Sequence, residues 1–296
     1  MNLKDVERLE IELTNTCNLE CVLCARQTIY SKNDFKIKKL LDLDNFKDFI
    51  KKLPNLKYVT LAGEYSEPTL HPKLFQIITY LHKLKMEISL FINAETHNDL
   101  YYKKLALLFK NTNSKIYLTI CGSTEELHQK YRVNSTLENV LHKAKVLSKI
   151  APKNTIVTWI IFEYNYQDYL DNKDFLKDYE HHIFYTIPYN EYYNLGYNDI
   201  CLPKHIQKHY KLDDNPQGTC KSIKNKFIYV DVDLNIYPCG IAKHNNFNFK
   251  DIENSLRPEC IECYSQNLKH LYLHNIFTVS ESENEFSEEE LYLENN

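Results

Sequence analysis

Six short apolar runs of β-strand type alternate with amphipathic helical stretches along the first two thirds of the chain, and this alternation restricts the fold most strongly. It predicts a parallel sheet whose strands are joined by right-handed helical crossovers. The predicted fold class is α/β, an open partial TIM barrel of the (β/α)6 type, followed by a small C-terminal module. The predicted strands are residues 9–14, 58–61, 86–92, 115–120, 155–162 and 182–187.

The segments between these strands carry signals that start helices. Capping boxes predict that one helix begins at Ser123, with Glu126, and that the next begins at Ser135, with Glu138. Pro72 is expected at the favoured first position of its helix. The other predicted helices are residues 44–53, 72–84, 98–109 and 166–179.

The loops after the predicted strands contain most of the candidate functional residues. In a parallel barrel these loops meet on one rim, and that rim is where active sites are found. The sequence therefore predicts an active-site face at the carboxyl ends of the strands. The loops on this face contain residues 17–24, 63–68, 93–95, 121–123, 163–165 and 188–190.

Composition narrows the class of protein further. No run of 18 apolar residues exists, so no membrane partner is expected, and the charged start MNLKDVERLE is unlike a secretory signal. The expected location is cytoplasmic, where thiols stay reduced, so grouped cysteines among the nine indicate metal or redox work. The formal net charge is −4, but the tail at 280–296 holds seven Glu, and the remainder is only mildly basic. This balance argues against a nucleic-acid partner, and the tail is predicted to be disordered.

Three cysteines, Cys17, Cys21 and Cys24, lie on the loop directly after the first strand. Three thiolates on a short loop can hold three irons of a cubane cluster and leave the fourth iron open for a small molecule. The alternatives are a zinc site completed by His71 and cysteines that merely fill the core.

A second group of four cysteines, Cys220, Cys239, Cys260 and Cys263, surrounds a hairpin predicted at residues 227–230 and 235–237. Four thiolates can saturate either a zinc ion or a 4Fe–4S cluster, and the spacing alone does not choose between them. We expect a second, small metal-binding module here.

The stretch TNTCNLECVLCA resembles the C-x3-C-x2-C signature of the radical S-adenosylmethionine (radical SAM) family. Residues 63–68, GEYSEP, are similar to that family's G-x-x-G-E-P stretch, with Ser66 in place of a Gly. Residues 121–132 resemble the stretch after strand four, where an Asp usually occupies the position of Cys121. Residues 159–165 resemble the segment that lines the adenine pocket.

This resemblance implies a set of site residues. The metal ligands would be the three cysteines of the first loop together with the four of the second group. For Glu67 the alternative is an exposed loop carboxylate, for Ser123 a helix cap, and for Arg132 a surface charge. The resemblance assigns no catalytic residue. The candidates are Cys121 and Tyr189, from their positions after predicted strands, together with Arg132. The implied SAM-binding residues are Gly63, Glu67, Pro68, Asn93, Ser123, Arg132 and Asn165.

The resemblance also implies a domain plan and a reaction. Residues 1–200 would form the radical SAM core, 201–279 a module similar to SPASM/twitch modules with an auxiliary 4Fe–4S cluster, and 280–296 the acidic tail. A donor such as flavodoxin or ferredoxin would reduce the first 4Fe–4S cluster. SAM would then yield a 5′-deoxyadenosyl radical that abstracts hydrogen from a peptide, or from an alcohol or sugar. The alternative is a non-catalytic iron–sulfur or zinc protein acting as a scaffold or sensor.

Overall fold

The computed structural model describes residues 2–28, 35–62, 65–185, 199–201, 203–204 and 225–238. All six predicted strands are confirmed, each with its bounds shifted by a few residues at most. Two further short strands follow them in the sequence. The strands are β1 Arg8–Ile11, β2 Tyr58–Leu61, β3 Glu87–Ile92, β4 Lys115–Ile120, β5 Thr155–Ile161, β6 Glu180–Tyr185, β7 Phe227–Val230 and β8 Ile236–Tyr237.

The strands form one open sheet in the order β6-β5-β4-β3-β2-β1-β7-β8. Every neighbouring pair from β6 to β7 is parallel, and only β8 runs antiparallel to its neighbour. Among the strands that the structure describes, the sheet does not close on itself, as predicted for a partial TIM barrel. The predicted C-terminal hairpin is confirmed as β7 and β8, and β7 extends this same sheet beside β1.

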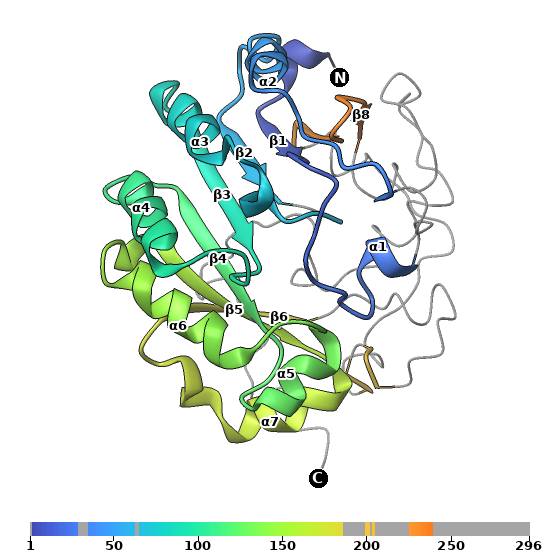
Figure 1. Ribbon diagram of the computed structural model, residues 1–296, viewed down its shortest axis with the longest axis vertical. Coiled ribbons are helices and arrows are strands. Elements are labelled where there is room, and N and C mark those ends of the chain that lie inside the picture. Colours follow the sequence, from blue (N-terminus) through green and yellow to red (C-terminus); the bar gives the residue numbers. More distant parts are fainter. Residues whose placement is uncertain are drawn as a thin grey trace.

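Helices cover one face of the sheet, where α2, α3, α4 and α6 follow the strands in turn (Figure 1). Side chains cap two of them, since Asp42 accepts backbone N–H groups of α2 and Asn98 accepts one of α4. Pro72 lies before α3, which begins at Leu74. The helices are α1 Ala25–Thr28, α2 Leu43–Ile50, α3 Leu74–Lys83, α4 Asp99–Phe109, α5 Glu125–Tyr131, α6 Leu137–Ser148 and α7 Tyr166–Asp171.

Two helix starts predicted from capping boxes are wrong by one residue. The N-cap of α5 is Thr124, whose side chain accepts the backbone N–H of Leu127, and the N-cap of α6 is Thr136. The helix predicted at 166–179 is also wrong in length. It ends at Asp171 and is followed by a short 3-10 turn, Lys173–Leu176.

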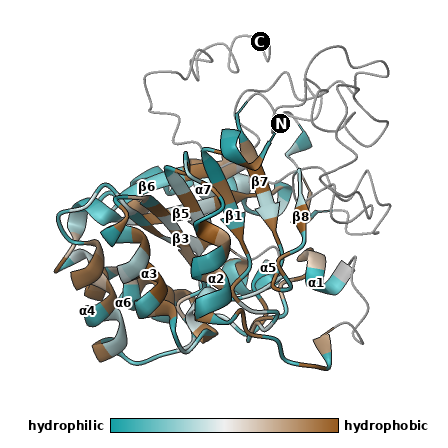
Figure 2. Ribbon diagram, turned by 90° about the horizontal axis from the view of Figure 1, so that it is seen from above, coloured by the Kyte–Doolittle hydropathy of each residue, from teal (hydrophilic) through white to brown (hydrophobic). Residues whose placement is uncertain are grey.

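The two faces of the sheet differ in chemistry. In β1 the side chains of Leu9 and Ile11 belong to the main hydrophobic core beneath the helices, whereas Glu10 alternates with them on the opposite face. Figure 2 shows hydrophobic and hydrophilic segments alternating along the helices that flank the strands. The helices and the core occupy one face of the sheet. The functional site is therefore to be sought on the opposite, polar face and on the rim loops.

Among the helices that the structure describes, none is long and apolar enough to span a membrane.

Candidate active site

The loop after β1 brings Cys17, Cys21 and Cys24 to the rim, directly before the short helix α1. All three side chains are partly exposed, and none forms a disulfide. The Cys17 sulfur accepts the backbone N–H of Leu19 at 3.4 Å and faces the amide nitrogen of Asn93 at 3.9 Å. The backbone N–H of Cys24 donates to the Cys21 carbonyl, which closes the loop into a turn.

Packing and hydrogen bonds fix this loop on both sides. Leu23 packs in a second hydrophobic cluster with Cys121, Phe162 and Ile200. Arg26, two residues beyond Cys24, donates from Nη1 to the carbonyl of Asn15 at 2.6 Å and to that of Tyr65 at 3.2 Å. The loop is thereby tied both to the end of β1 and to the loop after β2.

Burial changes the protonation of these thiols. Loss of solvation raises the pKa of Cys17 to about 12, and the negative charge of the nearby Glu67 carboxylate is the second largest cause. Burial likewise raises the pKa values of Cys21 and Cys24. The three thiols are thus protonated in the protein alone, and a metal that binds them must displace their protons.

Glu67 is a buried carboxylate at the rim, which contradicts the alternative of an exposed loop residue. Its Oε1 accepts the backbone N–H of Thr69 at 3.0 Å and the Thr69 hydroxyl at 2.5 Å. Its Oε2 accepts the backbone N–H of Asn93 at 2.7 Å. Burial raises the pKa of Glu67, while the hydrogen bonds from Thr69 and Asn93 act in the opposite direction. This carboxylate joins the loops after β2 and β3.

Arg132 follows the last turn of α5 and points into the same region. The alternative of a surface charge is wrong, because Arg132 is only 7% exposed. Its charge lies within electrostatic reach of Cys17, Cys21 and Glu67. Its Nε and Nη2 atoms are buried and have no hydrogen-bond partner among the described residues. A buried guanidinium with idle donors is a site for an anion.

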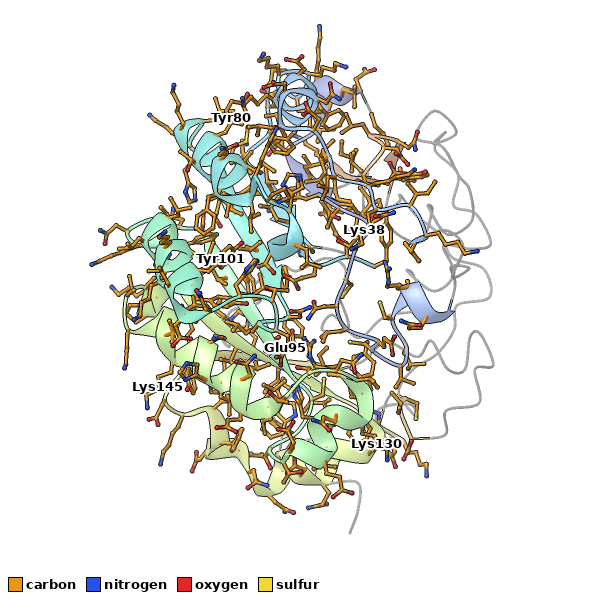
Figure 3. The ribbon with its side chains drawn as sticks, in the orientation of Figure 1. Lys38, Tyr80, Glu95, Tyr101, Lys130 and Lys145 are labelled. Carbon is orange, nitrogen blue, oxygen red and sulfur yellow. The ribbon has the colours of Figure 1, made fainter. Side chains whose placement is uncertain are left out.

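His128, one turn before Arg132, is a site residue that the sequence analysis missed. Its Nδ1 accepts the backbone N–H of Cys121, and its Nε2 bonds the Ser135 hydroxyl at 3.0 Å. Ser135 in turn donates to Glu95 at 3.0 Å, and Figure 3 labels Glu95 on the loop after β3. Burial, with Arg132 second, lowers the pKa of His128 to about 3, so the imidazole stays neutral. The signal available in the sequence was that His128 stands four residues before Arg132, which is the spacing of neighbours on one face of a helix.

Two other predicted residues are engaged within the protein. Ser123 caps no helix; its N–H and hydroxyl both donate to Asp168, at 2.8 and 2.5 Å. Asn165 donates to the carbonyls of Cys121 and Ile160, and its own oxygen accepts the N–H of Phe162. Both side chains therefore hold the loops after β4 and β5 in place.

The remaining predicted residues divide between the rim and the undescribed part of the chain. Pro68 is buried and begins a 3-10 turn, Pro68–Leu70. His71 does not complete a zinc site, because its Nε2 bonds the Leu41 carbonyl and its Nδ1 accepts the N–H of Lys73. The residues outside the described segments are Gly63, Tyr189, Cys220, Cys239, Cys260 and Cys263.

The residues present fit an iron–sulfur cluster with a small anionic ligand. Within the described segments, no three His, Cys, Asp or Glu side chains converge on a point where one metal ion could sit. Cubane ligands bind separate irons and so need not converge in this way. Three thiols on one loop supply the ligands, and the idle donors of Arg132 supply positive charge beside them.

A comparison with known protein families identifies the superfamily of this chain. The model of the Radical SAM superfamily matches residues 11–176, which include the three-cysteine loop, Glu67 and Arg132. The chain belongs to the radical SAM superfamily. Enzymes of this superfamily use a 4Fe–4S cluster and SAM.

Several individual radical SAM proteins are similar to this chain. GTP 3′,8-cyclase of Helicobacter pylori is 25% identical over 176 residues, which are 58% of this chain and 53% of that protein. The chain spans about half the length of the curated relatives it matches.

Solved structures share the fold at low sequence identity. Streptococcus suis SuiB bound to precursor peptide SuiA matches with a TM-score of 0.61 and 12% identity, over 89% of this chain and 65% of that one. The structure of anSMEcpe with bound AdoMet matches with a TM-score of 0.51 and 16% identity, over 79% and 71% of the two chains.

Proposed function

We propose that this radical SAM enzyme holds its 4Fe–4S cluster through Cys17, Cys21 and Cys24, and that Arg132 receives the carboxylate of SAM. One observation carries the proposal. Arg132 is buried within electrostatic reach of the Cys17 and Cys21 thiols, and its Nε and Nη2 donors have no partner among the described residues. A buried cation is costly unless an anion pairs with it, and a planar guanidinium suits a carboxylate.

In this proposal some residues of the chain bind the cluster and others position SAM. When bound, the cluster and SAM together supply a 5′-deoxyadenosyl radical that abstracts hydrogen from the substrate. The three thiolates bind three irons and leave the fourth without a protein ligand. Arg132 orients SAM, and Glu67 fixes the two loops between which SAM would lie. Among the other predicted SAM contacts, Gly63, Pro68 and Asn93 are kept in the proposal. Ser123 and Asn165 are assigned instead to holding the neighbouring loops.

A peptide is the substrate class that we propose. SuiB was solved with precursor peptide SuiA, and anSMEcpe was solved with the Cp18Cys peptide. Both share this fold over most of the present chain. The curated relative, a GTP 3′,8-cyclase, makes a nucleotide the alternative to test, alongside an alcohol or sugar.

The second cysteine group belongs to the same proposal. Cys220, Cys239, Cys260 and Cys263 would hold an auxiliary 4Fe–4S cluster that takes the electron left on the oxidised substrate. Cys263→Ala should then leave SAM cleavage intact and abolish product formation. Product formed by that variant contradicts the electron-acceptor role. Flavodoxin or ferredoxin is the proposed source of the reducing electron.

The deciding experiment is anaerobic reconstitution of the full chain followed by reduction and addition of SAM. We expect roughly 8 iron atoms per chain, as two cubane clusters require, and formation of 5′-deoxyadenosine. Cys24→Ala should lose this product. Cys201→Ala is the matched control, since it removes a buried thiol outside the loop, and it should keep the product.

Each outcome bears on a separate part of the proposal. Bound zinc in place of iron would support a scaffold or sensor and overturn the assignment of the cysteines. Product that persists in Cys24→Ala would do the same. With cleavage established, stimulation by a peptide library but not by GTP supports the peptide class, and the reverse contradicts it.

A further inference from the structure

We infer that Asn93 sets the reduction potential of the cluster by donating an amide N–H to the sulfur of Cys17. The inference rests on the proposed function, because it requires that Cys17 binds the cluster. Asn93 is then a positioning and tuning residue that acts through the cysteine and need not touch SAM.

The orientation of the Asn93 amide is fixed by its neighbours. Its Oδ1 accepts the backbone N–H of Glu95 at 3.0 Å, which identifies that atom as the oxygen and directs the nitrogen the other way. Its Nδ2 donates to Asn18 Oδ1 at 2.7 Å and lies 3.9 Å from the Cys17 sulfur. An amide nitrogen has two hydrogens, so one is available to each acceptor. The side chain is only 6% exposed.

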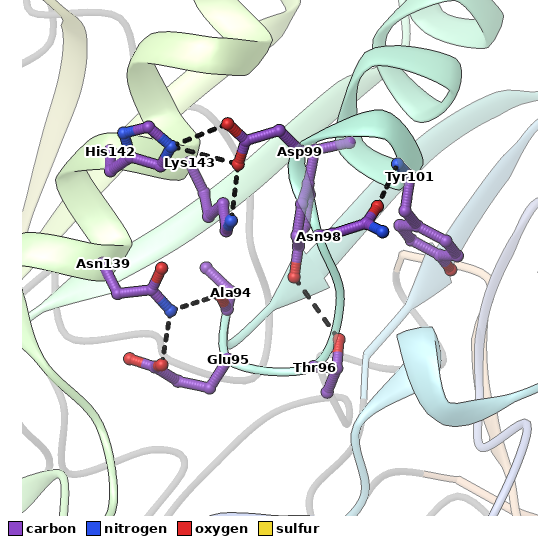
Figure 4. Close-up of polar contacts among 10 residues, drawn as sticks. Ala94, Glu95, Thr96, Asn98, Asp99, Tyr101, Asn139, His142 and Lys143 are labelled. Atoms are coloured by element: carbon purple, nitrogen blue, oxygen red, sulfur yellow. Dashed lines mark hydrogen bonds and ion pairs between the residues drawn. The ribbon is translucent and has the colours of Figure 1, made fainter.

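The loop that carries Asn93 is held from outside the site. Figure 4 shows Asn139 of α6 donating to the Ala94 carbonyl and to the Glu95 carboxylate, at 3.1 and 2.5 Å. Ser135 and the backbone N–H of Thr136 also donate to Glu95, at 3.0 and 2.7 Å. Asn93 itself is held by its backbone N–H on the Glu67 carboxylate. These hydrogen bonds fix the loop, so the Asn93 amide is held in a constant position relative to the Cys17 sulfur.

This loop also contains a strained residue. Ala94, directly after Asn93, has φ 68°, in the left-handed region that a residue with a Cβ rarely adopts. Such a conformation is unfavourable relative to the ordinary helical region, because it brings Cβ close to the following carbonyl oxygen. The surrounding hydrogen bonds maintain it, and strain of this kind gathers at functional sites. The unusual backbone is what turns the chain sharply between Asn93 and Glu95.

The electrostatic direction of the effect follows from charge. Reduction adds one negative charge to the cluster and its cysteine sulfurs. An N–H dipole that points at a ligand sulfur stabilises the reduced form more than the oxidised form, and so raises the reduction potential. Removing the Asn93 amide should therefore lower the potential and make the cluster harder to reduce.

The test is an EPR-monitored redox titration of the anaerobically reconstituted full chain without SAM. The signal of the first cluster is the one that Cys24→Ala removes. Asn93→Ala, and the isosteric Asn93→Asp, which exchanges the donor for an acceptor, should both shift its midpoint potential to lower values. Iron content should equal that of the wild type.

Asn18→Ser is the matched control, because it removes the other acceptor of the amide and leaves the amide and Cys17 in place. Its midpoint should match the wild type. An unchanged or raised midpoint in Asn93→Ala overturns the inference, and so does an equal shift in Asn18→Ser, which would reflect a moved loop. A wild-type chain without the cluster fails the proposed function instead, so the two failures are distinguishable.

Discussion

Glu67 and Arg132 are both buried and charged, and both lie at the rim, yet the regions around them differ. Around Glu67, three donors from the loops after β2 and β3 satisfy the carboxylate. Around Arg132, at the end of α5, two guanidinium donors have no partner among the described residues. The difference separates a charge that holds the fold together from a charge that awaits a ligand.

Substitutions in the region around Glu67 should change the stability of the fold, and substitutions in the region around Arg132 should change the affinity for SAM. A satisfied buried carboxylate leaves orphaned donors when it is removed, and each of these costs free energy. An unsatisfied buried guanidinium already carries that cost in the protein alone. The comparison can therefore be tested by measuring unfolding and SAM binding on the same set of variants.

The largest effect is expected at Glu67. Glu67→Ala leaves the backbone N–H groups of Thr69 and Asn93 without an acceptor, whereas the Thr69 hydroxyl still has the Thr96 hydroxyl at 2.7 Å. The change should lower the free energy of unfolding by roughly 2–5 kcal/mol. Urea denaturation measures this change. Glu126→Ala, on the exposed side of α5, is the control and should stay within about 0.5 kcal/mol of wild type. A small effect at Glu67 would break the comparison.

Arg132 should show the opposite pattern. Arg132→Met removes a charge-assisted contact worth roughly 1.5–3 kcal/mol, so SAM should bind about 10-fold to 100-fold more weakly. The free energy of unfolding should stay the same or rise, because an unpaired buried charge is lost. Anaerobic calorimetry with SAM measures the first change and urea denaturation the second.

Lys145→Met on α6 is the control for this variant, since Lys145 is exposed and lies at the outer side of the molecule in Figure 3. It should alter neither quantity. If Arg132→Met unfolds more easily and binds SAM normally, Arg132 is a structural residue and the proposed SAM contact is wrong.

His128 should give the protein a pH dependence that sharpens the contrast. Its pKa is lowered to about 3 in the folded protein, so the unfolded chain takes up a proton first as the pH falls below the ordinary value of 6.5. Stability from this residue is complete above pH 6.5 and is lost towards pH 3, by up to about 1.4 kcal/mol per pH unit.

His128→Gln should remove this part of the acid sensitivity. Urea denaturation of both proteins at a series of pH values checks it, and the stability difference between them should narrow as the pH falls. A constant difference across that range would mean that His128 is not held neutral.

The smallest effect concerns the start of α5. Thr124→Ala should lower the free energy of unfolding by about 1 kcal/mol, the usual value of an N-cap side chain. Thr136→Ala should cost a similar amount on α6, which makes the two caps a matched pair. If Thr124→Ala costs nothing, the Thr124 side chain does not stabilise α5, and other contacts, such as those of His128, hold the helix.

The features of the fold that depend on local sequence patterns could be predicted from the sequence. The six strands were found because apolar runs and crossovers have a short-range signature, and the rim followed from the parallel arrangement. The caps were misplaced because Ser123 and Thr124 are adjacent hydroxyl residues, and only the backbone geometry decides which oxygen meets the helix N–H groups. The helix after β5 was overextended because its pattern does not reveal the break at Asn172.

The sequence named candidate site residues but not the contacts that each of them makes. Cys17 and Glu67 were predicted on rim loops, and Arg132 was named only through the family resemblance. That Glu67 is satisfied by Asn93, a residue of a different loop, depends on a tertiary contact. The idle donors of Arg132 are likewise a property of the packed protein. Whether a buried charge is structural or awaits a ligand therefore could not be read from the sequence.

The pairing of β7 with β1 has a consequence for biosynthesis. Glu10 lies beside Tyr229 in the sheet, so one edge of β1 gains its partner only after residues 227–230 have left the ribosome. Until then the nascent chain carries an open strand edge, which invites pairing with other chains. Contacts this distant in sequence also form slowly. Docking of β7 is thus the late step at which a chaperone that covers strand edges would help this protein most.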